Sequence, residues 1–177
     1  VLLLKIRGDN YPDTGGGDQW DLMLIEAIKP AHAVDSSFMA QLGDLVAFEE
    51  DHFAFGPSWG VIEAAYNGNS FYHIEMFKAV AGKADELLQE RRMENSYLSA
   101  TGLKPNMIFR RVAGSDVDSF TIGFHKDIEA FAASSTVRDE EKEAAAVAAG
   151  FKSRSDISFY LRTLISSHND TLAIKVD

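Results

Sequence analysis

The sequence contains no cysteine. This absence excludes disulfide bonds, thiolate metal sites and cysteine nucleophiles, and it fits any cellular compartment. No apolar run approaches the roughly 18–20 residues that cross a bilayer as a helix, and no signal peptide is visible. We therefore expect a soluble protein without a membrane partner, and periplasmic, secreted and cytoplasmic locations all stay open.

Positive charge and chain-breaking residues are both scarce. With 17 basic against 27 acidic residues, the formal net charge is −10, which repels nucleic-acid phosphates and anionic membranes. Only 4 prolines and 13 glycines occur among 177 residues, while 46% of the residues are hydrophobic. That composition is globular rather than disordered. The sequence thus predicts a folded chain that does not bind nucleic acid.

Four strands and two helical regions are predicted in the second half of the chain. The strands are Phe71–Val80, Asn106–Ala113, Ser119–His125 and Thr171–Val176. Lys83–Ala100 is helical between the first two strands, and Lys126–Ser166 is helical in pieces between the last two. The order β-α-β-β-α-β is that of the ferredoxin-like unit. We therefore predict an α+β fold with an open antiparallel sheet and helices on one face.

Local signals place further helices. The spacing of apolar residues predicts a helix from about Ser36 through Phe53, which the pair Gly56-Pro57 ends. A short helix is predicted over Ser58–Tyr66. Asp139–Ala149 is predicted as an alanine-rich helix, because acidic residues begin it and Gly150 follows at the position that favours a left-handed residue.

The N-terminal third resembles part of the second half. Val1–Arg7 and Trp20–Ile28 are strand-like, with Gly8 corresponding to Gly114 and Asp21 to Asp118. We predict a partial first ferredoxin-like repeat in residues 1–66, with its hairpin in a second sheet, and a complete repeat in residues 70–177. Two unrelated hairpins would give the same pattern. Because the chain starts in strand register without Met, we expect it to be the ordered part of a longer protein.

Two segments, FYHIEMFKAVAGKADELL and RRVAGSDVDSFTIGF, carry a resemblance to a known superfamily. In the first segment a strand runs through a Gly-Lys turn into an acidic helix start, and the second is a strand pair. Residues 70–177 resemble the dimeric α/β-barrel superfamily, which includes antibiotic-biosynthesis monooxygenase and NIPSNAP-like domains. The resemblance implies two ferredoxin-like units whose sheets pair into a barrel, as a homodimer or as fused repeats. Family activities range from oxygenation and haem degradation to none known, so the resemblance selects no function.

Alternation along the strands divides their residues between two faces. Apolar sets such as Tyr72, Ile74 and Met76 are expected to pack against helices. The opposite, mixed sets are expected to face the barrel interior or a partner sheet. They contain the candidate ligand-binding residues Phe71, Phe77, Thr121 and Lys175, together with His73, Glu75, Gly123 and His125. Arg111 is a further binding candidate, as a partner for these polar groups.

His73, Glu75 and His125 are the candidate catalytic residues. Two imidazoles and one carboxylate form the ligand set of non-haem iron sites, and His73 and Glu75 share a face because they lie two apart on one strand. The alternative is that the three residues form hydrogen bonds within a polar barrel seam. We rank that alternative first, so no cofactor is predicted, while a divalent metal, or haem on His73 or His125, stays open.

The leading hypothesis is a small-molecule-binding or enzymatic α/β-barrel protein of unassigned substrate. Its ligand would lie in the barrel or between the sheet and the helices. The alternative is a non-catalytic structural or self-association module, and homo-oligomers are open under both hypotheses. A cavity lined by His73, Glu75 and His125 would favour the first, and side chains filling that space would favour the second.

Overall fold

The structure is a computed structural model that describes residues 2–6, 22–27, 50–114 and 116–176. Its strands are β1 (Leu2–Ile6), β2 (Leu22–Ile25), β3 (His52–Phe55), β4 (Phe71–Ala79), β5 (Met107–Gly114), β6 (Ser119–His125) and β7 (Ile165–Lys175). Its helices are α2 (Trp59–Asn67), α3 (Ala84–Ala100), α4 (Ile128–Ala132), α5 (Asp139–Ala149) and α6 (Asp156–Leu164). No helix in the described ranges is long and apolar enough to span a membrane.

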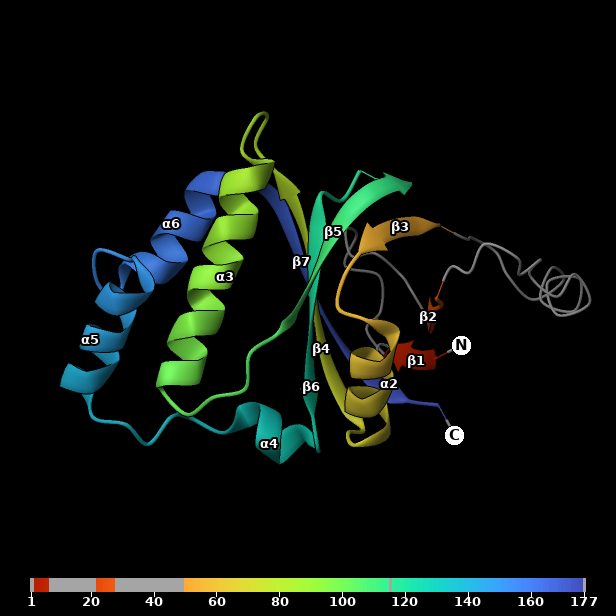
Figure 1. Ribbon diagram of the computed structural model, residues 1–177, viewed down its shortest axis with the longest axis horizontal. Helices are drawn as coiled ribbons and strands as arrows, with labels where there is room; N and C mark the ends of the chain where they lie inside the picture. The colour runs from red at the N-terminus through yellow and green to blue at the C-terminus, as the bar shows by residue number, and fades with distance from the viewer. Residues whose placement is uncertain (1, 7–21, 28–49, 115, 177) are drawn as a thin grey trace, which may run out of the picture.

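The strands form one seven-stranded sheet in the order β2-β1-β7-β4-β6-β5-β3, with every neighbouring pair antiparallel. Its central part, β7-β4-β6-β5, uses the four strands predicted for the second half of the chain. The predicted α+β class and antiparallel sheet are confirmed, and this order is compatible with a ferredoxin-like unit. Helices α3, α5 and α6 lie on one side of the sheet, and α2 lies on the other (Figure 1).

The N-terminal hairpin does not form a second sheet, so that prediction is wrong. β1 pairs with β2 and also with β7, where Leu4 lies opposite Lys175 and Ile6 opposite Ala173. The hairpin therefore extends the same sheet beyond β7. Of the residues that suggested a repeat, Gly8 and Asp21 lie outside the described residues.

Phe53 belongs to β3 and not to a helix, which corrects the end of the helix predicted from Ser36. β3 pairs with the edge of β5, with His52 opposite Gly114 and Phe55 opposite Arg110. Gly114 has φ +103°, and a Cβ there would fall on the backbone carbonyl of Asp51, so only glycine lets the two strands approach. Residues 36–49 lie outside the described residues.

Strand β7 begins six residues before the predicted Thr171. Helix α6 ends at Leu164, and β7 starts at Ile165. The added segment, ISSHND, is polar and lacks the alternation that marks a strand. Pairing with β4 holds it in place, with His168 opposite Phe77 and Asp170 opposite Glu75. This extension brings His168 and Asp170 onto the same sheet face as Glu75.

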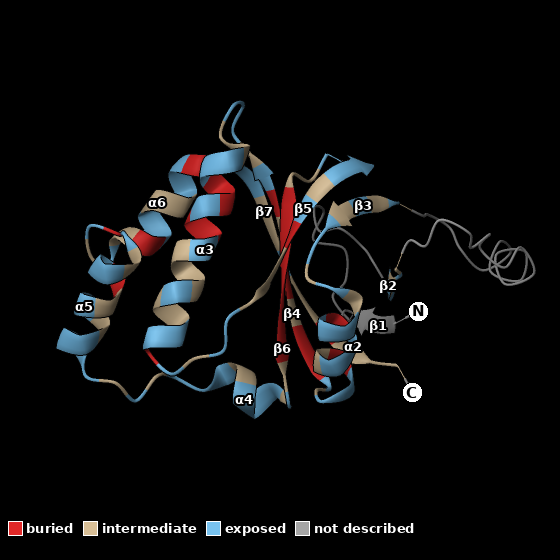
Figure 2. Cartoon of the chain, in the orientation of Figure 1, coloured by how far each residue is buried: buried red, intermediate tan, exposed pale blue. Residues whose placement is uncertain are grey.

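Two layers of side chains cover the two faces of the sheet. On the α2 side, buried residues of α2 pack on the apolar sets of β4 and β6, forming the cluster Ile62, Tyr66, Tyr72, Ile74, Phe109, Phe120, Ile122, Phe124 and Ala173. On the other side, Phe77 packs with Leu87 of α3 and Leu164 of α6. Figure 2 shows the buried residues running along β4 and β6 and on α3.

The mixed face therefore lies under α3 and α6, which corrects the prediction that it faces a barrel interior. The apolar sets do meet a helix, as predicted, but that helix is the short α2. Polar residues of β4 lie under α3 because that helix carries its own buried charges, Glu90 and Arg91. A polar face is acceptable beneath a helix when the helix supplies the partners.

Candidate functional site

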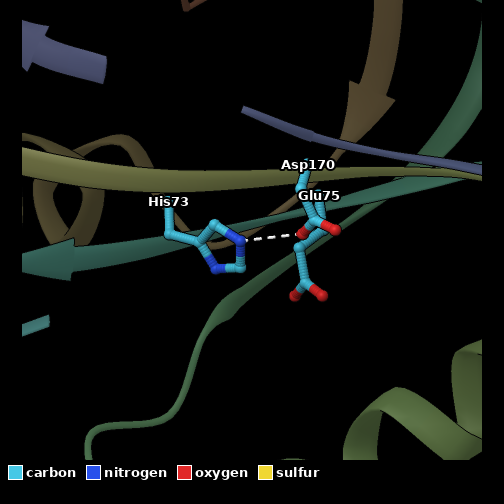
Figure 3. A group of neighbouring side chains, drawn as sticks. All are labelled: His73, Glu75 and Asp170. Carbon is cyan, nitrogen blue, oxygen red and sulfur yellow. Dashed lines mark hydrogen bonds and ion pairs between the residues drawn. The ribbon is translucent and has the colours of Figure 1, made fainter. Parts of the chain in front are cut away.

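Four side chains from two adjacent strands form the candidate site, which we call the His/carboxylate cluster: His73 and Glu75 of β4, and His168 and Asp170 of β7. The two residues from each strand lie two positions apart and so share a face. His73 Nε2 lies 2.8 Å from Asp170 Oδ1. Figure 3 shows this imidazole directed at the Asp170 carboxylate, with Glu75 beside it. One ligand atom each from His73, Glu75 and Asp170 lies within 4.8 Å of the other two.

His168 completes the cluster without a hydrogen bond. Its Nε2 atom lies 3.6 Å from both Glu75 Oε1 and Asp170 Oδ1, a separation too long for a hydrogen bond. The Nε2 atom is buried and has no hydrogen-bond partner among the described residues. Its ring stacks on Phe77, with centroids 4.7 Å apart. The nearby Glu75 carboxylate raises the pKa of His168, against the opposing effect of burial.

Glu75 is the buried centre of the cluster, only 9% exposed. Thr121 donates a hydrogen bond of 2.8 Å to its Oε2 atom, and Asn106 donates a longer one of 3.3 Å. Burial raises the pKa of Glu75, but His168, Arg91 and Thr121 together outweigh burial and hold that pKa below its usual range. Glu75 is therefore a carboxylate at neutral pH.

A buried ion network of α3 lies over Glu75. Arg91, 2% exposed, donates bonds of 2.6 and 2.9 Å to Glu90, which is fully buried. Its Nη1 atom lies 2.6 Å from Glu94 Oε2 and 3.8 Å from Glu75 Oε1. The guanidinium also covers the ring of Phe77, at 4.9 Å from the centroid. Burial raises the pKa of Glu90, and it raises that of Glu94 to about 7 despite Arg91.

Phe131 of α4 fills the space beside His73 and His125, the two histidines that were predicted to converge. Its ring centroid lies 5.5 Å from that of Phe71, 5.1 Å from His73 and 5.3 Å from His125. Burial, together with Lys104 and His73, lowers the pKa of His125. A Cβ on Gly123 would lie 2.8 Å from His125 Nε2, so the glycine makes room for that ring. His125 is not part of the metal-ligand group found among the described residues, which is His73, Glu75 and Asp170.

The other predicted binding residues divide between the two faces. Thr121 and Phe77 contact the His/carboxylate cluster, and Phe71 contacts Phe131. Lys175 lies on the α2 side, with its Nζ atom 4.5 Å from the ring centroid of Tyr66. Arg111 pairs with Asp118 at 2.9 Å, across the β5–β6 hairpin. The structure therefore does not bring Lys175 or Arg111 to the cluster.

Sequence reasoning missed His168, Asp170 and Arg91. The two β7 residues lie between the predicted helical region, which ended at Ser166, and the predicted strand, which began at Thr171. Their spacing, His-x-Asp, matches His-x-Glu of β4, and this repeated spacing was the signal available in the sequence.

A cavity of about 200 Å³ lies away from the His/carboxylate cluster. Its lining residues are Glu50, His52, Met76, Lys78, Asp116, Val117, Ser167 and Asn169. Met76 packs with the α2-side core, so this hollow opens on the face opposite to Glu75. Lys78 and Asp116 form an ion pair within it. The cavity thus provides no space for a ligand at His73.

Comparisons of the chain with protein-family models, with curated proteins and with solved structures give no match.

Proposed function

We propose that the chain is a small-molecule-binding or enzymatic protein whose site is the His/carboxylate cluster. The observation that carries this proposal is the 2.8 Å contact between His73 Nε2 and Asp170 Oδ1. An ionised carboxylate only accepts, so Nε2 donates the hydrogen bond, and in the neutral imidazole the other ring nitrogen holds the lone pair. A histidine oriented by a carboxylate in this way is the arrangement of a general base. His73 would then take a proton from the bound molecule, and Asp170 would stabilise the imidazolium.

The ligand would lie between the sheet and α4, against His73, Phe71 and His125. Phe131 occupies this space, so binding requires α4 to shift. Helix α4 has five residues and buries none of them, so its displacement exposes little apolar surface. Helix α3, by contrast, is fixed by its buried charges.

The test measures ligand binding and stability on the same variants, in buffer with a chelator. Haem is added and followed by absorption, and a panel of small aromatic and carboxylic acids is screened by thermal shift. His73→Ala should abolish binding of any compound that binds the unaltered protein, while barely changing the melting temperature. His52→Gln is the matched control, because His52 lies on the α2 side against Phe120.

The second candidate is a non-catalytic structural or self-association module. This candidate is favoured by Phe131, whose ring fills the space beside His73 as a packing side chain would. Under this alternative His73 is a structural partner of Asp170, and its removal lowers stability by about 1–3 kcal/mol. A clear fall in melting temperature for His73→Ala, with no compound bound in the screen, would replace the first proposal with this one.

We also propose that the chain belongs to the dimeric α/β-barrel superfamily and pairs with a second ferredoxin-like unit, supplied by a second copy of the chain. The support is the β7-β4-β6-β5 order and the apolar side chains exposed on the outer strands, Leu22 of β2 and Phe55 of β3. Light scattering after size-exclusion chromatography should give twice the mass of one chain if a second copy supplies the unit. A mass of one chain would contradict a second copy.

A further inference from the structure

We infer that the His/carboxylate cluster binds one divalent transition-metal ion, held by His73, Glu75, Asp170 and His168. This inference rests on the proposed function in that it assigns a cofactor to the same side chains. When the ion binds, His73 Nε2 releases its proton to solvent and becomes a ligand, so His73 acts as a general base only in the metal-free protein. The sequence had left open a metal on His73, Glu75 and His125, and this inference puts His168 and Asp170 of β7 in place of His125.

The distances suit an ion. Nitrogen and oxygen ligands lie about 2.0–2.2 Å from zinc and surround it tetrahedrally, so two ligand atoms on one ion are about 3.4 Å apart. The 2.8 Å between His73 Nε2 and Asp170 Oδ1 is somewhat shorter than this spacing, and the 3.6 Å from His168 Nε2 to Glu75 Oε1 and to Asp170 Oδ1 is close to it. The ligand atoms of His73, Glu75 and Asp170 all lie within 4.8 Å of one another. Small side-chain rotations would therefore complete the coordination.

His168 provides an independent observation. Its Nε2 atom is buried, has no hydrogen-bond partner in the described part of the chain, and is equidistant, at 3.6 Å, from one oxygen each of Glu75 and Asp170. Buried polar atoms are nearly always satisfied. An ion between these three atoms would satisfy the nitrogen and both carboxylates at once.

The surrounding charge also favours a cation. Glu75 and Asp170 are two acidic groups, and the nearest guanidinium, Arg91, is 3.8 Å from Glu75. Arg91 is already bonded to Glu90 and Glu94 at 2.6 Å each. The guanidinium of Arg91 is therefore directed chiefly at Glu90 and Glu94, and its longer contact with Glu75 neutralises that carboxylate only in part. A divalent cation would supply the remaining counter-charge.

The ligand types restrict the metal. Two imidazoles with two carboxylates suit Fe²⁺, Zn²⁺, Mn²⁺ or Co²⁺, whereas Mg²⁺ and Ca²⁺ prefer sites made of oxygen alone. Asp170 is 55% exposed, so the ion would be reachable from solvent on that side. Water or a small molecule would complete its coordination.

The test uses the metals alone, with no organic ligand. Chelator-treated protein, freed of the chelator, is titrated with Co²⁺ by visible absorption and with Zn²⁺ by calorimetry. We expect one equivalent of either ion to bind. Asp170→Asn and His168→Gln should weaken binding by more than the roughly 10- to 100-fold that loss of an outer-shell partner costs. Asp170→Asn is the decisive variant, since its exposed side chain is replaced without disturbing the fold.

His125→Gln is the matched control, because its imidazole lies on the same sheet face, next to Phe131 and outside the cluster. It should bind Co²⁺ as the unaltered protein does. The inference is overturned if the unaltered protein takes up no stoichiometric Co²⁺ or Zn²⁺. It is also overturned if His125→Gln weakens binding as much as Asp170→Asn. If the protein takes up metal but binds no organic compound in the chelator screen, the metal site stands and the proton-transfer proposal fails. If it binds an organic compound but takes up no metal, the proton-transfer proposal stands and the metal site fails.

Discussion

Replacing Arg91 with methionine should destabilise the protein severely. The substitution keeps an unbranched side chain in place but removes a buried charge that contacts Glu90, Glu94 and Glu75. Glu90 has no exposed surface and would be left without its two hydrogen bonds from the guanidinium. Breaking a buried ion pair from one side costs about 3–5 kcal/mol. For a chain of this size each kcal/mol shifts the melting temperature by about 2–4 °C, so we expect a fall of about 6–20 °C.

Thermal unfolding followed by circular dichroism at pH 7 measures this fall. Arg138→Met is the matched control, because Arg138 also bonds a glutamate, Glu141, at 2.9 Å but lies exposed at the N-cap of α5. It should lower the melting temperature far less than Arg91→Met does, because a solvent-exposed ion pair stabilises a protein little. Adding Glu90→Gln to Arg91→Met should recover part of the loss, since the amide carries no charge. An Arg91→Met variant as stable as the Arg138→Met control would refute the buried ion network as a stabilising element.

Two further predictions concern pH and the sheet edge. The pKa of Glu94 is raised to about 7, so the folded protein holds this proton more tightly than the unfolded chain does. The resulting contribution to the free energy of unfolding is fully present below the ordinary pKa of 4.5 and is lost as pH rises through 7. The pKa of His168 is also raised, so its contribution to stability is likewise lost as pH rises above its ordinary pKa of 6.5. The free energy of unfolding should therefore fall between pH 5 and pH 8, and Glu94 alone should account for on the order of 3 kcal/mol of that fall. Glu94→Gln should flatten the profile in urea titrations, and an unchanged profile would contradict the assignment. Gly114→Ala should detach β3 and lower the melting temperature, because the added Cβ would meet the Asp51 carbonyl. Gly60→Ala in α2 is the control: its Cβ would meet open space, so the substitution should be neutral or stabilising by up to about 1 kcal/mol. Equal effects of the two glycine variants would contradict this account of the β3–β5 contact.

Local sequence signals placed most central elements. Strand β6 spans the predicted Ser119–His125, and α5 spans the predicted Asp139–Ala149, ending at a left-handed Gly150. Both have clear local causes, namely apolar alternation in the strand and a glycine stop after the helix. The polar start of β7 has no such cause, because only its pairing with β4 makes it a strand.

The candidate site was half predictable for the same reason. His73 and Glu75 lie on one strand, so alternation alone put them on one face. Asp170 and His168 join them through the register between β4 and β7, which a single sequence does not reveal. Arg91 is buried while its neighbour Arg92 is exposed, and only the packing of α3 on the sheet separates these two arginines.

The most direct test of the His/carboxylate cluster as a binding site is an anomalous difference map from crystals soaked in Zn²⁺. Our account predicts that the strongest peak lies between His73, Glu75 and Asp170, within bonding distance of His168 Nε2. A map with no peak there, or with its strongest peak at His125 or His52, would contradict it.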